Sequence, residues 1–382
     1  MMTVLYDEQG FAQAHGGVSR YFVELMKRCP AGWDWCLPIL KTQNVYLQGE
    51  PFNIAAKEHC EKSRLAHLFN MVLAMALPKM VETEDAVNHR NYLKTLENGR
   101  FDILHVTSPH PRMNTWKKAV GRHPIVATIH DLTPERFWKY DLLIPRMRRR
   151  LIADASHLIT VSEHTKRDLQ ELYDVPDEKI SVVYNGQSLE ISDLGKQIEW
   201  LPEKYILHVG KREGYKNFDF FVKSIASVLK ADRQLFLVCT GSEFTKREER
   251  LLDSLGVRGQ TIHRFVRDDE MPALFARAQV FVSASLYEGF GLPTVDAFCA
   301  GCPVLLSRSS CYPEIGGDAA CYFNNGDKDD FQRQIRRILN DEVFRDELRR
   351  KGAVRAGLYT WEKCARETFA VYRRVLDSFK GA

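Results

Sequence analysis

The chain has 382 residues, which is more than one ordinary hydrophobic core accommodates, so two domains are expected. Hydrophobic residues make up 45% and charged residues 27% of the sequence, the usual balance of a globular protein. The net charge of +4, from 54 Lys and Arg against 50 Asp and Glu, is too small to argue for a nucleic-acid partner.

The start of the chain, Met1–Asp7, has the pattern of a short strand and lacks the basic, apolar and small-residue regions of a signal peptide. No run of about 18 apolar residues is present, so no membrane-spanning helix is expected. The nine cysteines are scattered and lie mostly in apolar segments, which favours free thiols in a reducing compartment. Cys299 and Cys302 have CxxC spacing, but no second Cys or His pair accompanies them, so burial is the preferred interpretation. These features predict a cytoplasmic protein.

Short β-rich apolar runs alternate with helical periodicities along most of the chain. The first part has strand candidates at Met2–Tyr6, Ile103–Val106, Ile125–Ile129, Leu158–Val161 and Ile180–Val183. After a stretch without a clear period, Gln187–Trp200, candidates follow at Tyr205–Val209, Leu235–Cys239, Gln279–Ser283 and Pro303–Leu306. Such alternation implies parallel sheets with helices on both faces. The predicted fold class is therefore α/β, with two doubly wound domains joined near residue 187 and a C-terminal helix within Trp361–Phe379.

Ligands bind at the carboxyl ends of parallel strands, which makes the segment after Ser283 the most informative one. Its sequence EGFGLP places glycines before a helix with Pro293 in the first turn and Gly301 as a natural stop. The free N–H groups of such a helix end suit a diphosphate, and the carboxylates of Glu288 and Asp296 suit sugar hydroxyls. A strand–turn–helix corner with acids that cap the helix explains the same residues equally well.

This segment resembles the signature of glycosyltransferase family 4, a group with the GT-B fold whose motif is Glu, seven residues and Glu. The matching sequence segments are EGFGLP, DAFCAGCPVL and PEIGGDAACYF. The resemblance implies that Glu288 contacts the donor sugar and that Asp296 holds the ribose of the nucleotide. The amides of Phe290, Gly291 and Leu292 are then expected to bind the diphosphate. Asp296 departs from the motif, where Glu is usual, and the shorter side chain needs a closer helix or a water to reach the ribose.

The loop after Tyr205–Val209 reads GKREGYKNF and places several cations at the carboxyl end of a strand. Such cations stabilise the charge on a departing diphosphate, although a solvated basic turn is the commoner explanation of a Lys/Arg cluster. The resemblance implies an Arg and a Lys with this role, assigned to Arg212 and Lys216, with Lys211 as the alternative for the Arg. Asn217 is predicted to cap the helix that follows.

Two loops of the first part also follow strands. Gly16 and Gly17 come after Met2–Tyr6; glycines often serve plain turns, and no GxGxxG fingerprint is present. The resemblance implies that this loop closes over the diphosphate. His130 follows Ile125–Ile129, and an isolated His is more often structural than catalytic. The resemblance implies that His130, with Asp131 beside it, lies at the donor sugar where bonds change.

Several positions give weaker signals. Gly241 follows a strand toward the expected donor cleft, and Ser162 resembles a family position on the other side of that cleft. Glu314 matches a family position near the nucleotide, and an acid that caps a helix explains it equally well. Four basic residues, Arg146, Arg148, Arg149 and Arg150, form a stretch suited to anionic lipid or a phosphorylated acceptor, with a solvated helix face as the alternative.

The resemblance extends over nearly the whole chain and implies a function for each part. Residues 1–186 would bind the acceptor and residues 187–360 the nucleotide sugar, with the helix in 361–382 packing back on the first domain. The implied reaction is retaining transfer of a sugar to a saccharide or lipid-linked acceptor during assembly of surface polysaccharide, with no cofactor. The absence of a strand-end Asp-x-Asp motif predicts independence from metals.

The donor is the least specific part of this expectation. The segment GYKNF is similar to that of bacterial transferases that use GDP donors of mannose or related sugars, so GDP-mannose is the expected donor. A UDP-sugar enzyme of the same fold and a non-catalytic nucleotide-sugar-binding protein remain alternatives. The expected location is the cytoplasm, with the four-arginine stretch as a possible contact with the inner face of the membrane.

Overall fold

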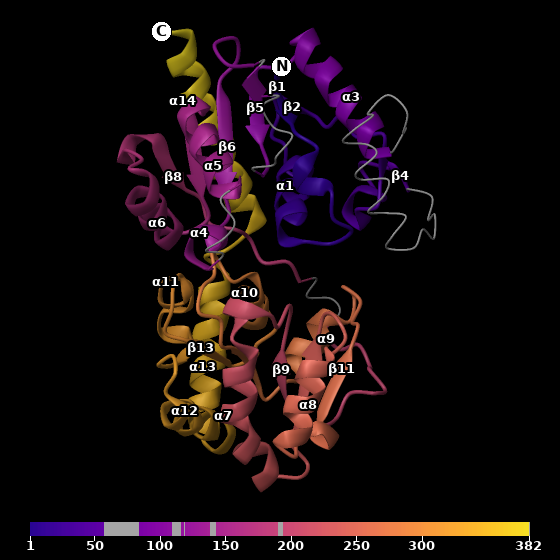
Figure 1. The fold of residues 1–382 in the computed structure, drawn as a ribbon, viewed down its shortest axis with the longest axis vertical. Coiled ribbons are helices and arrows are strands. Elements are labelled where there is room, and N and C mark those ends of the chain that lie inside the picture. The colour runs from indigo at the N-terminus through magenta and orange to yellow at the C-terminus, as the bar shows by residue number, and fades with distance from the viewer. Residues whose placement is uncertain (57–83, 109–115, 118, 138–142, 190–193, 382) are drawn as a thin grey trace.

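In the computed structural model of the chain, the described residues are 1–56, 84–108, 116–117, 119–137, 143–189 and 194–381. They contain two parallel six-stranded sheets, one above the other in Figure 1, with helices packed around each. A separate pair of short strands, β3 (Lys41–Thr42) and β4 (Ala55–Ala56), lies beside the first sheet. This architecture confirms the predicted α/β fold class with two doubly wound sheets.

The first sheet has the strand order β2-β1-β5-β6-β7-β8, and every neighbouring pair is parallel. Its strands are β1 (Met2–Tyr6), β2 (Trp33–Cys36), β5 (Ile103–Val106), β6 (Ile125–Ile129), β7 (His157–Thr160) and β8 (Ile180–Val182). The helices of this part are α1 (Gly17–Lys27), α3 (Glu84–Asn98), α4 (Thr133–Phe137), α5 (Leu143–Asp154) and α6 (Glu163–Tyr173). Every residue of the central strands β5 and β6 is buried, as expected of strands covered on both faces.

The second sheet has the order β11-β10-β9-β12-β13-β14. Its strands are β9 (Tyr205–His208), β10 (Phe236–Thr240), β11 (Thr261–Arg264), β12 (Val280–Ser283), β13 (Val304–Ser307) and β14 (Cys321–Phe323). Its helices are α7 (Phe218–Ala231), α8 (Lys246–Ser254), α9 (Met271–Ala276), α10 (Leu292–Cys299), α11 (Tyr312–Gly316), α12 (Lys328–Asn340) and α13 (Glu342–Ala356). Short 3-10 turns lie at Gln9–Phe11, Val45–Leu47, Asp177–Lys179, Gly214–Lys216, Arg258–Gln260 and Gly317–Ala319.

All of the strands predicted from the sequence are observed, and their ends differ from the prediction by one residue at most. The strands that the sequence pattern missed in the two large sheets, β2, β11 and β14, all lie at sheet edges. An edge strand is covered on fewer sides than a central one, so its sequence is less continuously apolar. Exposed Asp34 in β2 and exposed Arg264 in β11 are examples, whereas β14 is apolar but only three residues long.

The last helix, α14 (Trp361–Lys380), returns from the second sheet and packs against the first (Figure 1). Trp361, Phe369 and Tyr372 join the core around the first sheet, and the Tyr372 hydroxyl lies 2.5 Å from Nδ1 of buried His105. The chain passes from the first sheet to the second at Gly186, where a Cβ would lie 2.3 Å from the backbone nitrogen of Trp361. Any larger residue at position 186 would collide with the backbone of Trp361, so only glycine fits there.

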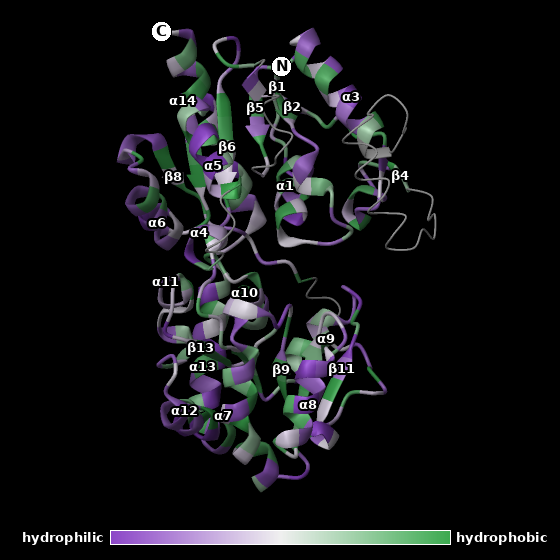
Figure 2. Cartoon of the chain, viewed as in Figure 1, coloured by the Kyte–Doolittle hydropathy of each residue, from purple (hydrophilic) through white to green (hydrophobic). Residues whose placement is uncertain are grey.

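We call the elements β1 to β8 together with α14 the first half, and the elements β9 to α13 the second half. In Figure 2 the hydrophobic colour lies mainly on the strands and on inward helix faces, with hydrophilic residues on the outward faces. Among the described residues, none of the helices is both long and apolar enough to cross a membrane.

Candidate functional site

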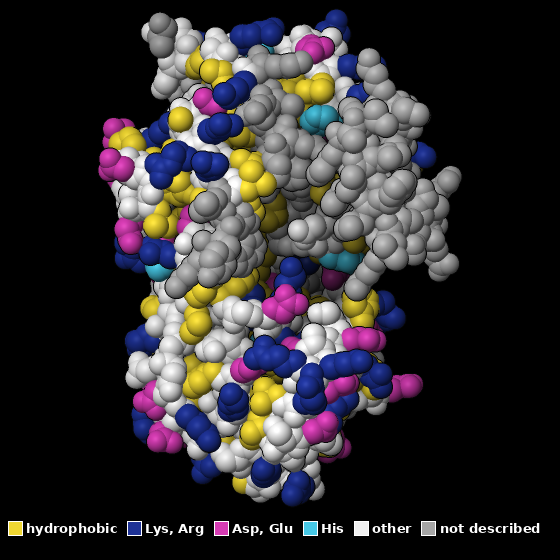
Figure 3. Space-filling model, in the orientation of Figure 1, with side chains coloured by type: hydrophobic (Ala, Val, Ile, Leu, Met, Phe, Trp, Pro, Cys, Tyr) yellow, Lys and Arg dark blue, Asp and Glu magenta, His cyan; other side chains and the backbone are white. Residues whose placement is uncertain are grey.

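The carboxyl ends of strands from both sheets border a recess between the halves (Figure 3). It comprises a larger cavity of about 730 Å³ and a smaller one of about 300 Å³. His130, Asp131, Lys211 and Lys216 border both cavities, whereas Glu288 borders only the smaller one. The recess therefore brings together loops from both halves.

Glu288 lies in the loop between β12 and α10 and forms an ion pair across the smaller cavity. Its Oε1 accepts a hydrogen bond from Lys216 Nζ at 2.6 Å, and the Tyr312 hydroxyl lies 3.5 Å from the same oxygen. The Glu288 backbone N–H donates to Ser310 Oγ at 2.9 Å, which holds the loop in place. Burial alone would lower the pKa of Lys216, but the carboxylate of Glu288, together with Tyr215 and Asp131, outweighs this effect and the pKa is raised. Lys216 is therefore a cation at neutral pH.

Arg212, predicted from the sequence to act beside Lys216, has a different set of partners in the structure. Its side chain is 2% exposed, and its Nε donates to Glu248 Oε1 at 2.9 Å. The guanidinium also donates to the backbone oxygens of Thr240, Ser242 and Glu243, and it lies over the ring of Phe244. These contacts use four of the five N–H groups of the guanidinium, and Arg212 is not among the residues that border either cavity.

Lys211, the neighbour of Arg212, borders both cavities and is exposed. Of these two neighbours, Lys211, the predicted alternative to Arg212, is therefore the one that faces the recess. Asn217 precedes α7 as predicted, but it has a left-handed backbone with φ of 56° and its side chain makes no capping hydrogen bond. Asn217 is thus the N-cap residue, as predicted, but its side chain does not supply the capping hydrogen bond.

The N-terminus of α10 faces the smaller cavity, which Phe290, Gly291 and Leu292 all border. Gly291 has φ of 79°, and a Cβ there would lie 2.8 Å from a ring carbon of Tyr312, so glycine is required on both counts. The first amides of a helix have no acceptor within the helix, and they provide partial positive charge for an anion. Gly17, at the start of α1, borders the same cavity opposite Leu292. Gly16 is the cap residue of α1 and does not border either cavity.

His130 follows β6 and faces the recess from the first half. Its ring packs edge-on against Tyr21 with centroids 5.1 Å apart. Burial lowers its pKa to about 4; Asp131 opposes this shift and Arg148 adds to it. His130 is therefore neutral at physiological pH, and its buried Nε2 has no hydrogen-bond partner among the described residues. Buried polar atoms are normally paired, so this nitrogen is available to a ligand.

Asp296 lies about one turn into α10, beside the chain that crosses between the halves. Its Oδ1 accepts a hydrogen bond from the Ser188 backbone N–H at 2.7 Å. Burial raises the pKa of Asp296 to about 6, while that bond and the nearby Arg20 oppose the shift. The structure places Asp296 outside the residues that border either cavity, next to Arg20, which donates to the Ser188 carbonyl oxygen at 2.7 Å.

Gly241 and Glu314, two positions with weaker signals in the sequence, make contacts within the protein that account for their residue types. Gly241 has φ of 100° and lies so close to the Gly210 carbonyl oxygen that a Cβ would be 2.9 Å from it; it does not border either cavity. The Glu314 carboxylate accepts hydrogen bonds from the backbone N–H groups of Glu163 at 2.7 Å and His164 at 3.0 Å. Glu314 therefore caps a helix, but that helix, α6, belongs to the other half.

The four-arginine stretch does not form one surface. Arg146, Arg149 and Arg150 of α5 are exposed, whereas Arg148 is buried. The Arg148 guanidinium donates to the Asp131 carbonyl oxygen at 2.5 Å and forms an ion pair at 3.3 Å with Glu135. The prediction that Arg148 belongs to an exposed basic face is wrong, because its side chain supports the loop that follows His130.

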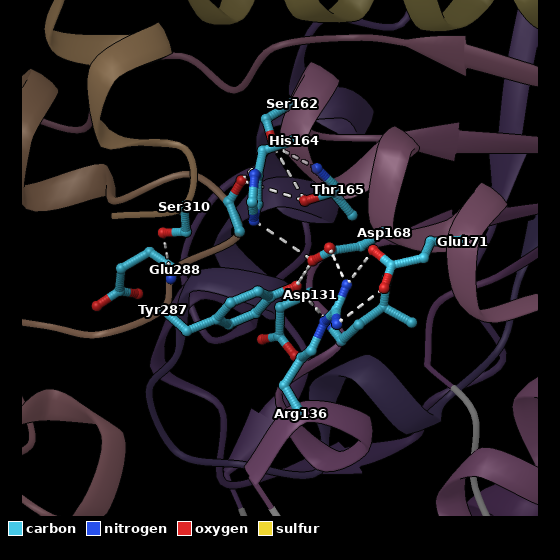
Figure 4. Close-up of polar contacts among 12 residues, drawn as sticks. Asp131, Arg136, Ser162, His164, Thr165, Asp168, Glu171, Tyr287, Glu288 and Ser310 are labelled. Carbon is cyan, nitrogen blue, oxygen red and sulfur yellow. Dashed lines mark hydrogen bonds and ion pairs between the residues drawn. The ribbon is translucent and has the colours of Figure 1, made fainter. Parts of the chain in front are cut away.

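Sequence reasoning missed the side chains that join the two halves around Glu288. The hydroxyl of Tyr287 contacts Asp168 in α6, and the hydroxyl of Ser162, at the start of α6, donates to the Gly289 carbonyl oxygen at 2.6 Å (Figure 4). Tyr287 directly precedes the EGFGLP segment and Ser162 matches a family position, but no local signal pairs residues so distant in the chain. Within the described ranges, no group of three or more His, Cys, Asp or Glu is arranged to hold a metal, and Cys299 and Cys302 are free thiols.

Comparison with known proteins gives matches in both halves. Residues 56–190 match Glycosyltransferase Family 4, and residues 194–355 match Glycosyl transferases group 1. The chain is 24% identical to O-antigen chain mannosyltransferase B of Escherichia coli over 97% of this chain and 100% of that protein. It is 30% identical to O-antigen chain mannosyltransferase RfbU of Salmonella typhimurium over 57% of this chain and 62% of that one.

Solved structures share the fold over the full length. Sucrose-phosphate synthase from Thermosynechococcus elongatus superposes with a TM-score of 0.75 at 19% identity and covers 99% of this chain and 100% of its own. Anabaena Alr3699/HepE, solved in complex with UDP and glucose, superposes with a TM-score of 0.74 at 16% identity over 98% of this chain and 100% of its own. The chain thus belongs to the group 1, or family 4, glycosyltransferases of the GT-B fold, a family that includes bacterial mannosyltransferases related to it.

Proposed function

We propose that the protein is a retaining mannosyltransferase that moves mannose, or a related sugar, from a GDP donor to a saccharide or lipid-linked acceptor. The relatives named as O-antigen mannosyltransferases, at 24% and 30% identity, support the choice of mannose and of surface polysaccharide as the product. The observation on which the proposal depends most is the ion pair of Glu288 and Lys216 in the smaller cavity, facing neutral His130.

The proposed donor site uses groups of the second half. The diphosphate of the donor lies at the N-terminus of α10, where the amides of Phe290, Gly291 and Leu292 bind it. Lys216 and Lys211 stabilise the charge that develops as the sugar–phosphate bond breaks. We assign this role to Lys211 rather than to Arg212, because the Arg212 guanidinium is occupied by Glu248.

The proposed transfer takes place on one face of the sugar, so that the anomeric configuration is kept. The bond between the anomeric carbon and the phosphate oxygen breaks, a bond to the acceptor hydroxyl oxygen forms, and the departing phosphate takes the proton of that hydroxyl. Glu288 accepts hydrogen bonds from the sugar hydroxyls and orients the ring. His130, which is neutral, provides a hydrogen bond through Nε2 near the reacting carbon.

We propose residues 1–186 with α14 as the acceptor-binding domain and residues 187–360 as the donor-binding domain. The larger cavity has an apolar side formed by Phe137 and Ile144 of the first half, and it is the proposed place of the acceptor. Exposed Arg146, Arg149 and Arg150 on α5 are the proposed contact with anionic lipid at the cytoplasmic face of the membrane, each contributing about 1 kcal/mol.

The test is a thermal-shift panel of GDP-, UDP- and ADP-sugars, followed by hydrolysis assays with the donors that stabilise the protein. Selective stabilisation by GDP-mannose is expected, whereas selective stabilisation by a UDP-sugar would move the assignment to that donor class. The Glu288→Ala variant should keep its fold and lose hydrolysis. Stabilisation by none of these compounds would contradict the proposed function.

A further inference from the structure

The Tyr287 hydroxyl bridges the two halves immediately beside Glu288. It donates a hydrogen bond to Asp168 Oδ2 of α6 at 2.6 Å and accepts one from the Leu132 backbone N–H at 3.2 Å. In Figure 4 the phenol ring extends toward Asp168, while the Glu288 carboxylate points away from it. Leu132 is two residues after His130, so a single oxygen atom joins the loop that holds Glu288 to the loop that holds His130.

Asp168 is a fixed and charged acceptor for this hydroxyl. Its side chain is 6% exposed, and its Oδ1 accepts a hydrogen bond from the Arg136 guanidinium at 2.6 Å. Arg136 is itself held by Glu171 at 2.7 Å. Burial, followed by the bond to Asp168, raises the pKa of Tyr287, so its hydroxyl remains protonated and continues to donate. A hydrogen bond to an ionised acceptor is roughly twice as strong as one between neutral groups.

The residue on the other side of Glu288 is also tied to the first half. The carbonyl oxygen of Gly289 accepts hydrogen bonds from Ser162 Oγ at 2.6 Å and from Thr165 Oγ1 at 3.3 Å. Both neighbours of Glu288 are therefore attached to α6, although Glu288 belongs to the second half. The position of its carboxylate relative to His130 depends on these contacts as well as on the fold of its own half.

We propose that Tyr287 and Asp168 are a positioning pair that holds Glu288 opposite His130 and so assembles the transfer site when the two halves are in contact. This inference rests on the roles proposed above for Glu288 and His130. Neither Tyr287 nor Asp168 touches the donor; both act through the two loops. Loss of the bridge lets the loops move independently, and a misplacement of about 1 Å can cost roughly 100-fold in rate.

The Tyr287→Phe variant isolates the hydroxyl, because the ring and its packing against Phe137 and His164 are kept. The matched control is Tyr205→Phe. The Tyr205 hydroxyl donates to the Leu274 carbonyl oxygen at 2.6 Å, and Tyr205 is also buried, within the second half and outside the residues that border either cavity. Both variants lose one buried hydroxyl, so a general loss of stability affects them alike.

With the donor selected by the thermal-shift panel, kcat of Tyr287→Phe should fall by roughly 10-fold to 100-fold, while the Kd for the free nucleotide changes by less than about 2-fold. Tyr205→Phe should keep the wild-type kcat. Asp168→Asn should resemble Tyr287→Phe, and the double variant should be no slower than the slower single variant, because the two groups act together. A wild-type kcat in Tyr287→Phe would overturn the inference.

Amide hydrogen exchange tests the bridge without any assay of activity, because it measures how firmly the Leu132 loop is held. Loss of the acceptor for the Leu132 N–H should speed exchange in the peptide that contains Leu132 by roughly 10-fold in Tyr287→Phe, with no change there in Tyr205→Phe. If the wild type processes none of the nucleotide sugars, the proposed function fails and the exchange rate still decides whether Tyr287 holds the loop. An unchanged exchange rate of the Leu132 peptide in Tyr287→Phe would by itself overturn the proposal that Tyr287 and Asp168 position the two loops.

Discussion

Gly289 of the second half lies directly against the backbone of His130 in the first half. A Cβ built on Gly289 would lie 1.7 Å from the carbonyl oxygen of His130 and 3.2 Å from Cβ of Asp131. The obstacle is backbone, which cannot turn aside as a flexible side chain can. A glycine next to Glu288 thus lets the motif of the second half approach the strand end that holds His130.

The Gly289→Ala variant should force the halves apart and lower kcat by roughly 100-fold or more, since the reacting groups are displaced. Gly259→Ala is the matched control, because a Cβ there would meet no atom within 4 Å. Small-angle scattering should show a larger radius of gyration for Gly289→Ala alone. An active Gly289→Ala variant with unchanged scattering would show that the close approach is dispensable.

Neighbouring residues Lys211 and Arg212 should respond to substitution in opposite ways. Lys211→Ala removes an exposed cation of the recess and should lower hydrolysis with a thermal midpoint within about 1 °C of the wild type. Arg212→Ala leaves Glu248 without its buried partner and should destabilise the fold by about 3 kcal/mol. Thermal melts and hydrolysis assays distinguish the two. A stable but inactive Arg212→Ala variant would restore the role that the sequence predicted for Arg212.

The ion pair of Lys216 and Glu288 should matter for the reaction far more than for stability. Both side chains are largely buried, 21% and 17% exposed, and Met keeps most of the apolar stem of Lys216, so we expect the free energy of unfolding to fall by only about 1 kcal/mol. Lys216→Met should therefore lower kcat by roughly 100-fold, since it removes a preorganised charge, while changing the thermal midpoint little. Lys196→Met, which breaks the ion pair with Asp269 away from both cavities, is the control and should keep full activity.

Asp296 should give donor binding a pH dependence near pH 6. Its pKa in the folded protein, about 6, lies above the ordinary 3.8 because of burial. If Asp296 holds the ribose, as the family resemblance implies, its ionised carboxylate is the better acceptor for the ribose hydroxyls, so donor affinity should rise as the pH increases through about 6. Isothermal titration with wild type and Asp296→Asn checks this, and an equally steep rise in Asp296→Asn would exclude Asp296 as the group that titrates.

The raised pKa of Asp296 affects the free energy of unfolding in the opposite direction, because stability should fall as the pH rises. The folded state binds the proton of Asp296 more tightly than the unfolded state, so the contribution of Asp296 is full below the ordinary pKa and is lost as the pH rises through about 6. The thermal midpoint of Asp296→Asn relative to wild type should therefore be higher at about pH 8 than at about pH 4. Buried Asp7, whose pKa is raised by burial to about 7, is present in both proteins, so its effect cancels in the comparison.

The sequence by itself determined the features that depend on neighbouring residues. Apolar runs covered on both faces marked the central strands, and the glycines and Pro293 marked the start of α10 beside Glu288. The edge strands β2 and β11 were missed because partial cover leaves their sequences more polar. The third missed edge strand, β14, is apolar but only three residues long. The placement of Glu288, Lys216 and His130 around one recess follows from their shared position at the carboxyl ends of parallel strands.

Only the tertiary structure decided which way adjacent side chains point and which distant residues meet. Lys211 and Arg212 are neighbours in the chain, yet the one faces the recess and the other pairs with Glu248. Tyr287 and Asp168 are 119 residues apart, and Glu314 caps a helix that begins 151 residues before it. Composition and periodicity describe contacts within a few residues, whereas these contacts exist only because the two halves fold and then pack against each other.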